Sequence, residues 1–195
     1  MRSEGGRRCL RALLLITVSA LVGGPSVAEV IDRILAVVDG RPLMLSEVRM
    51  LQGVRGVEEA VAMEALIDER LMLREASRLP QAAVTPDEEE KAFSSLLALH
   101  PTETAGIPEA DLRRLTRRQS AIVKYVEFRF RPQVRITDAE VRKAYDEEYG
   151  GRADAPDYDA VAAELTDRLA TRSLDERIEA WVRELRSASE IRYNR

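Results

Sequence analysis

Residues 30–48, VIDRILAVVDGRPLMLSEV, decide the fold of this chain. Val30–Val38 predict a strand, and the unbroken apolar run at its end indicates burial on both faces. Asp39-Gly40 is typical of a two-residue hairpin turn, because a type I′ turn needs positive φ at both central residues. The stretch therefore predicts a hairpin whose first strand lies in the core.

The returning arm of this hairpin is expected over Arg41–Leu45, where Pro42 restricts it to a sheet edge or a strand start. Ser46 follows, and a serine hydroxyl at a helix N-cap accepts a hydrogen bond from a first-turn backbone N–H. We therefore expect Ser46 to cap a helix, and the pattern after it is helical almost to the end of the chain.

The first 28 residues have the three parts of a secretion signal. A basic start precedes the apolar run Ala12–Val22, which is about half the ~20 residues that a membrane-spanning helix needs. Small residues then place the cleavage between Ala28 and Glu29. Arg7-Arg8 leaves Sec export and twin-arginine export both open. We expect a periplasmic protein without a stable membrane anchor.

Composition excludes several classes of function. Cys9 is the only cysteine and leaves with the signal, so the mature chain can form neither disulfides nor thiolate metal sites. The net charge is −4 at pH 7, which argues against binding to nucleic acid. The length after cleavage suits one ordinary domain, residues 29–195, with a substantial core.

Apolar residues spaced by three and four predict that this domain is helical. Two helix starts carry a capping box, in which Thr85 is followed by Glu88 and Thr137 by Glu140. Gly150–Pro156 is the one clear linker. The predicted helices cover residues 46–54, 57–79, 86–99, 109–131, 138–149 and a long last stretch after the linker. The side chains expected to face the core from the third and fourth of them are Phe93, Leu96, Leu97, Leu112, Leu115, Ile122 and Val126.

The last helix is expected to run unbroken. Ser173 and Glu176 have the spacing of a further cap, but no glycine or proline beside them supports a break. Ile191–Tyr193 then predicts a short strand that pairs with the Val30–Leu45 hairpin. The fold class is therefore mainly α with a small β-sheet, and Trp181 should be among the larger core residues.

Residues that suggest chemistry have simpler structural interpretations. His100 is the only histidine, which rules out a metal site built on several imidazoles, and it lies in a loop beside Pro101. Arg113-Arg114 and Arg117-Arg118 fit a solvated helix face. Glu88–Glu90 are first-turn acids that complement the helix dipole. No catalytic residue, cofactor or metal site is predicted, and no nucleotide-binding loop occurs.

The order of these elements resembles the N-terminal chaperone module of SurA-type periplasmic proteins. The resemblance covers nearly all of residues 29–195 and depends on order and pattern together. It is carried by VIDRILAVVDGRPLMLSEVRM (30–50), ALIDERLMLREASRL (65–79), VTPDEEEKAFSSL (84–96), ADLRRLTRRQSAIVKYV (110–126), VRITDAEVRKAYDEEYG (134–150) and DERIEAWVRELRSASEIRY (175–193).

The resemblance implies a helical module closed by its C-terminal helix and strand, and a chaperone that holds unfolded outer-membrane proteins. Relatives commonly carry one or two parvulin-type prolyl isomerase domains between the last two helices. Residues 150–156 cannot hold such a domain, which needs on the order of 100 residues. Isomerase activity is therefore not expected.

We thus expect an ATP-independent periplasmic chaperone that binds unfolded outer-membrane or secreted proteins through an apolar groove. Met44, Met50 and Leu51 are the candidate client contacts, because thioethers adapt to varied apolar partners, although methionines also fill ordinary cores. Two alternatives remain, a non-enzymatic envelope adaptor that binds one folded partner and a prolyl isomerase. The sequence leaves the clients, their affinity and the oligomeric state open.

Overall fold

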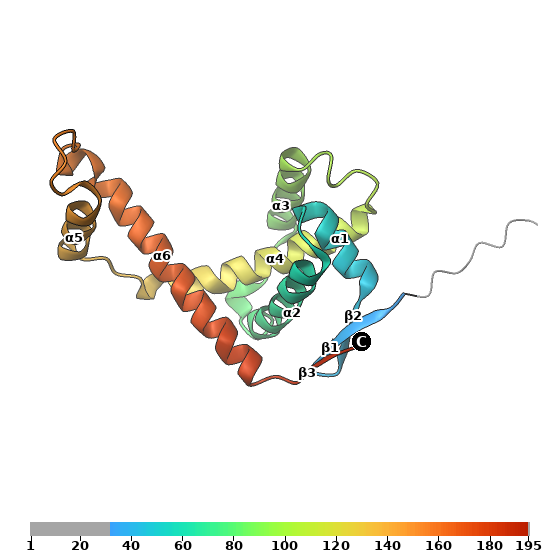
Figure 1. The fold of residues 1–195 in the computed structure, drawn as a ribbon. Helices are drawn as coiled ribbons and strands as arrows, with labels where there is room; N and C mark the ends of the chain where they lie inside the picture. The colour runs from blue at the N-terminus through green and yellow to red at the C-terminus, as the bar shows by residue number, and fades with distance from the viewer. Residues whose placement is uncertain (1–31, 195) are drawn as a thin grey trace, which may run out of the picture. The chain divides into compact units, whose positions relative to one another are not determined.

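Two strands open the described part of the chain and a third closes it, with six α-helices between them (Figure 1). The computed structural model describes residues 32–194. The elements, in chain order, are β1 (Ile34–Val38), β2 (Arg41–Met44), α1 (Leu45–Arg55), α2 (Glu59–Ala76), a 3-10 turn (Pro80–Ala82), α3 (Pro86–Leu99), α4 (Glu109–Arg129), a second 3-10 turn (Arg131–Gln133), α5 (Asp138–Tyr149), α6 (Tyr158–Ser187) and β3 (Ile191–Tyr193).

The three strands form one antiparallel sheet in the order β2-β1-β3. Asp39 and Gly40 both have positive φ, 47° and 75°, as the predicted hairpin turn requires. The C-terminal strand pairs with the first, with Val37 opposite Arg192. The predicted closure of the sheet by the last residues is therefore confirmed. Within the described residues β1 begins at Ile34, so the expected start at Val30 was too early, and Val30 itself lies outside them.

The prediction that Ser46 caps α1 is wrong. The N-cap is Met44, because Glu47 stands three residues after it and accepts a hydrogen bond from the Met44 N–H at 3.1 Å. Ser46 lies in the first turn, where its N–H and its hydroxyl both donate to the carboxylate of Asp32. These bonds lower the pKa of Asp32, the hydroxyl bond most strongly. The Asp32 carboxylate, 14 residues before Ser46, thus accepts the first-turn N–H that no side chain at the N-cap position accepts.

The two predicted capping boxes are confirmed. The Thr85 and Thr137 hydroxyls each accept a bond from the backbone N–H of the glutamate three residues later, and the carboxylate of that glutamate accepts a bond from the backbone N–H of the threonine. The helices α2 and α4 are shorter than the ranges 57–79 and 109–131 that the sequence predicts. Helix α2 ends at Ala76, and the chain has left the helical region by Leu79, whose extended conformation suits the residue before a proline.

A main core cluster lies where the sheet, α1, α2, α3 and α4 meet. Most of its buried side chains are leucine and valine from the hairpin and the first two helices. Trp181 of α6 is half-buried and packs both against this core and against a second cluster built on α4 and α6. It stacks on Tyr125 with ring centroids 5.0 Å apart and lies 5.2 Å from Phe130. Trp181 therefore joins two clusters, a role that the sequence pattern did not indicate.

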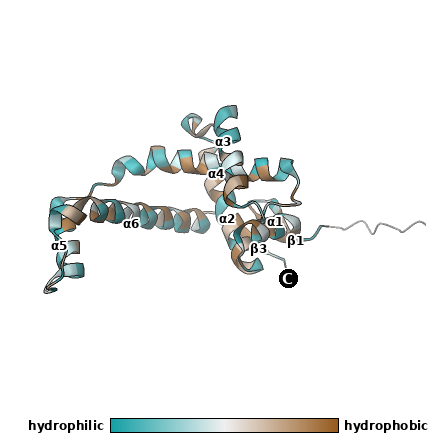
Figure 2. Cartoon of the chain, turned by 90° about the horizontal axis from the view of Figure 1, so that it is seen from above, coloured by the Kyte–Doolittle hydropathy of each residue, from teal (hydrophilic) through white to brown (hydrophobic). Residues whose placement is uncertain are grey.

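Helix α6 is a single helix of 30 residues. The prediction that it runs unbroken past Ser173 and Glu176 is therefore confirmed. Polar and apolar residues alternate along it (Figure 2). Its first half packs against α5, and residues 150–157 join the two as the predicted linker. Tyr145 fixes this junction by donating to the Pro156 carbonyl at 2.7 Å. In residues 32–194 no helix combines the length and hydropathy needed to cross a bilayer.

Candidate binding surfaces

An open apolar groove of about 510 Å³ runs between α3 and α4. Helix α3 supplies Ala92, Leu96 and Leu99 at spacings of four and three, so these side chains lie on one face. Helix α4 supplies Val123 on the other side. Leu99 is 75% exposed and Val123 is 58% exposed, so apolar surface faces solvent here. We call this surface the α3–α4 groove; it is lined by Glu88, Lys91, Ala92, Ser95, Leu96, Leu99, His100, Thr116, Gln119, Ser120, Val123 and Lys124.

A salt bridge at the groove holds its two helices together. Lys124 of α4 donates to both carboxylate oxygens of Glu88 at 2.8 Å and to the Ala83 carbonyl at 2.6 Å. The pKa of Glu88 is lowered to about 2, first by the bond from Lys124 and then by the bond from the backbone N–H of Thr85. Glu88 is therefore both a helix cap and a tie between α3 and α4, which fixes the separation of the groove walls.

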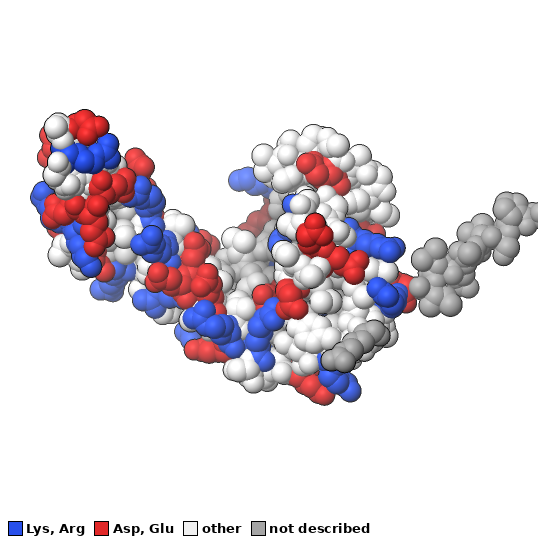
Figure 3. Space-filling view, in the orientation of Figure 1, with Lys and Arg blue, Asp and Glu red and all other residues white. Residues whose placement is uncertain are grey.

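Figure 3 shows how charged residues are distributed over one face of the molecule. The surface over α3 and the loop that follows it is mostly uncharged, whereas α5 and α6 are densely covered with both signs of charge. A solvated helix face normally carries interspersed charges, and a contiguous apolar surface is typical of an interaction site. Leu96, Leu99 and Val123 give the groove an apolar strip that can contact apolar side chains of another polypeptide.

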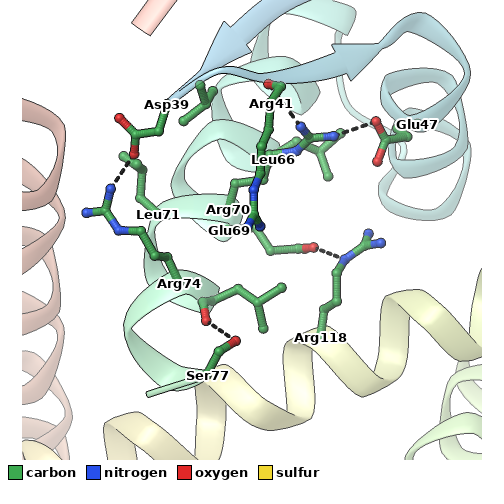
Figure 4. Close-up of a pocket in the computed structure, with 12 residues that line it drawn as sticks. Asp39, Arg41, Glu47, Leu66, Glu69, Arg70, Leu71, Arg74, Ser77 and Arg118 are labelled. Carbon is green, nitrogen blue, oxygen red and sulfur yellow. Dashed lines mark hydrogen bonds and ion pairs between the residues drawn. The ribbon is translucent and has the colours of Figure 1, made fainter. Parts of the chain in front are cut away.

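A second concavity, of about 530 Å³, lies between the hairpin, α2 and α4 (Figure 4). Three arginines that line it pair with three acids: Arg70 with Glu47, Arg74 with Asp39, and Arg118 with Glu69 at 2.6 Å. Its full lining is Val38, Asp39, Arg41, Glu47, Leu66, Glu69, Arg70, Leu71, Leu73, Arg74, Ser77 and Arg118. We call this concavity the arginine pocket. It shares no residue with the α3–α4 groove.

The three residues expected to contact clients lie outside both concavities. Leu51 is 0% exposed and belongs to the main core, so it offers no surface to a partner in this conformation. Met50 is half-buried and packs on the same core, and Met44 is half-buried at the start of α1. For Met44 and Met50 a part in binding stays a prediction, and the larger apolar surface lies elsewhere.

Small departures from the core pattern could have revealed the groove. Helix α3 buries Phe93 as predicted; Leu97, which lies outside the groove, is 37% exposed, so the expectation that it faces the core was wrong. Leu99 of the groove was not assigned to the core. Val123 follows Ile122 directly and falls outside the row of spacings that faces the core. Apolar residues left over after one helix face has been assigned to the core were the available signal.

One basic residue departs from the predicted solvated face. Arg118 turns toward α2, where its Nε donates to the carboxylate of Glu69. Glu69 is only 5% exposed. Arg113 and Arg117 lie outside and pair with acids of α3. His100 caps the end of α3 and lines the groove. Among the described residues no three histidine, cysteine or acidic side chains gather as metal ligands would.

No protein-family model and no curated protein matches the chain. Among solved structures it is similar to a chain described with the virulence factor PEB4 and the periplasmic protein Cj1289, two structurally related SurA-like chaperones of Campylobacter jejuni. The two chains are 14% identical with a TM-score of 0.54, and the similarity covers 83% of this chain and 99% of that one. The predicted mainly helical fold with a small sheet is confirmed, and the fold is SurA-like.

Proposed function

We propose that this protein is an ATP-independent chaperone that holds unfolded polypeptides in the α3–α4 groove. The groove is the observation that carries the proposal, because Leu99 and Val123 leave apolar surface exposed between two helices that a salt bridge ties to each other. The likeness of the fold to SurA-like chaperones supports the same function. Binding would use apolar contact, which is non-directional and accepts many sequences.

The proposed clients are unfolded outer-membrane or secreted proteins in the periplasm. Two observations support this site of action: residues 1–28 have the pattern of a secretion signal, and the similar structure was described with a periplasmic protein. Residues 1–31 lie outside the described part of the chain, so the signal itself stays a prediction.

The test compares two valines of matched exposure. Val123 in the groove is 58% exposed, and Val61 on α2, which lines neither concavity, is 55% exposed. Val123→Asp should weaken client binding roughly tenfold, because it removes an apolar contact and places a charge in the groove. Val61→Asp should bind as the unchanged protein does. The measurement is suppression of light scattering when a denatured outer-membrane barrel protein is diluted from urea.

Three outcomes would contradict the proposal. The first is no suppression by the unchanged protein at stoichiometric excess, and the second is equal suppression by the two valine variants. The third is acceleration of proline-limited refolding, because a holding chaperone has no catalytic step. Capture of one folded envelope protein in stoichiometric amount, without unfolded clients, would favour the adaptor function instead.

A further inference from the structure

One position of the apolar row on α4 carries a carboxamide. Leu112, Leu115, Ile122 and Val126 of this row are at most 9% exposed. Gln119 follows Leu115 by four residues and precedes Ile122 by three, which places it beside them on the helix surface. It is half-buried and lines the α3–α4 groove. A polar side chain therefore stands in the groove wall where the spacing would place an apolar one.

The polar atoms of the Gln119 side chain have no hydrogen-bond partner within residues 32–194. On the same wall, the Thr116 hydroxyl donates to the Arg113 carbonyl at 3.0 Å, and Lys124 donates to Glu88. Neither the oxygen nor the nitrogen of Gln119 is among the side-chain atoms that are buried without a partner. Both atoms are therefore accessible to a ligand in the groove that the residue lines.

A carboxamide suits the backbone of a bound polypeptide. It offers an N–H donor and a carbonyl acceptor, the same two groups that a peptide unit carries. It can accept a bond from a backbone N–H and donate one to a nearby backbone carbonyl, whatever the side chains of the ligand are. A helix uses its own N–H and C=O groups internally, whereas an extended segment leaves them free. The Gln119 side chain therefore favours extended segments over helical ones.

The length of the groove suits an extended segment. On α3 the lining runs from Glu88 to Leu99, about 16 Å along the helix axis at 1.5 Å per residue. About five residues of extended chain cover that distance. Every second side chain of such a segment points to the same side, so alternate apolar residues would all meet the strip of Leu96, Leu99 and Val123. Strands of outer-membrane barrels have this alternation.

We propose that the α3–α4 groove binds client segments in extended conformation and that the Gln119 carboxamide bonds to their backbone. The inference rests on the proposed function of the groove. It adds the conformation of the bound segment and names a residue that recognises it. Because a backbone contact does not depend on sequence, Gln119 adds hydrogen bonds to apolar binding without restricting the range of clients.

Fluorescence anisotropy tests the role of Gln119 with the full chain and the labelled peptide fluorescein-Thr-Val-Thr-Leu-Thr-Val-Thr-amide. Gln119→Leu makes the groove wall more apolar and removes both hydrogen-bonding groups. It should bind the peptide roughly fivefold more weakly, as the loss of one or two neutral hydrogen bonds predicts. If the carboxamide were only a solvated side chain, the added apolar surface would strengthen binding instead. The two readings therefore differ in the sign of the effect.

Gln52→Leu is the matched control. Gln52 is a half-buried glutamine of α1 whose side chain makes no hydrogen bond within residues 32–194 and lines neither concavity. Its variant should bind the peptide as the unchanged protein does. Neither variant should melt at a lower temperature than the unchanged protein, because neither side chain has a hydrogen bond to lose in the described part of the chain.

Methylation of single backbone nitrogens locates the contact on the peptide. Each of the three central N–H groups is methylated in turn, which removes one donor at a time. At one position at least, methylation should weaken binding to the unchanged protein, and that loss should disappear in Gln119→Leu. A loss of affinity in Gln119→Leu that no methylated position shares would overturn backbone recognition.

The remaining outcomes separate this inference from the function on which it rests. Equal or tighter binding by Gln119→Leu, while Val123→Asp still weakens binding, would overturn backbone recognition and leave the proposed function in place. Equal binding by Val123→Asp and the unchanged protein, or no binding by the unchanged protein, would overturn both.

Discussion

At the scale of single residues, turns and helix caps follow the local sequence, except where a side chain distant in the sequence makes the hydrogen bond instead. Asp39-Gly40, Thr85 and Thr137 act as the sequence predicts, because each turn or cap is made by residues within three positions. The Ser46 hydroxyl could cap a helix as the hydroxyls of Thr85 and Thr137 do, but the N-cap of α1 is Met44. The Asp32 carboxylate that binds Ser46 lies 14 residues away, and no local pattern reports such a contact.

Glu88 should give the protein an acid-dependent stability. Its folded pKa, about 2, is below its ordinary value of 4.5, so the carboxylate stabilises the fold fully above pH 4.5. That contribution is lost progressively as the pH falls from 4.5 toward 2, when protonation breaks the bonds from Lys124 and Thr85. Glu88→Gln should therefore melt at a lower temperature than the unchanged protein at pH 7. At pH 2 the two melting temperatures should lie closer together.

The matched control for this measurement is Glu103→Gln. Glu103 is exposed in the loop after α3, and no hydrogen bond or ion pair of its side chain occurs within the described residues. Its variant should melt as the unchanged protein does at both pH values. A difference between Glu88→Gln and the unchanged protein that stays constant from pH 7 to pH 2 would show that the carboxylate charge is not what ties α3 to α4.

At the scale of elements, the C-terminal strand completes a sheet that the N-terminal hairpin begins. Asp39 N–H donates to the Glu190 carbonyl at 2.9 Å, and the Glu190 N–H donates back to the Asp39 carboxylate at 2.9 Å. Arg186 ties the end of α6 to Glu64 and Asp68 of α2. Pairing of first and last strands was predictable from hydrophobic pattern and the order of elements, but these polar contacts were not, because no sequence pattern marks which charged side chains meet once the strands pair.

Removal of residues 189–195 should destabilise the whole domain. The truncation loses the pairing of β3 with β1 and the half-buried Ile191, which packs on the main core. Together these contacts are worth about 2–4 kcal/mol of unfolding free energy. Urea unfolding followed by circular dichroism measures the change.

Arg192→Gln is the control for the truncation. Arg192 is exposed and pairs with Glu190, so its variant should change the unfolding free energy by less than about 0.5 kcal/mol. An unchanged midpoint for the truncated protein would mean that the hairpin is stable without β3. The idea that the chain closes on its own first strand would then have to be abandoned.

At the scale of the whole molecule, the sequence predicts the fold better than the binding surface. The class, the sheet and most helices follow from periodicity and caps, and the likeness to a SurA-like chaperone agrees with them. Met44, Met50 and Leu51 were predicted as client contacts because flexible or apolar side chains suit binding, but Leu51 is fully buried in the core. Which apolar residues remain exposed depends on the angle at which α3 packs on α4. The spacing of apolar residues within either helix does not determine that angle.

Photo-crosslinking tests the central claim, that unfolded chains bind in the α3–α4 groove, most directly. A photoreactive amino acid placed at Val123, or at Val61 as the control of equal exposure, is illuminated with a urea-diluted outer-membrane barrel protein. We predict strong client crosslinks from position 123, weak ones from position 61, and loss of both when the client has folded. Equal crosslinking from the two positions, or crosslinks from position 61 alone, would contradict the account.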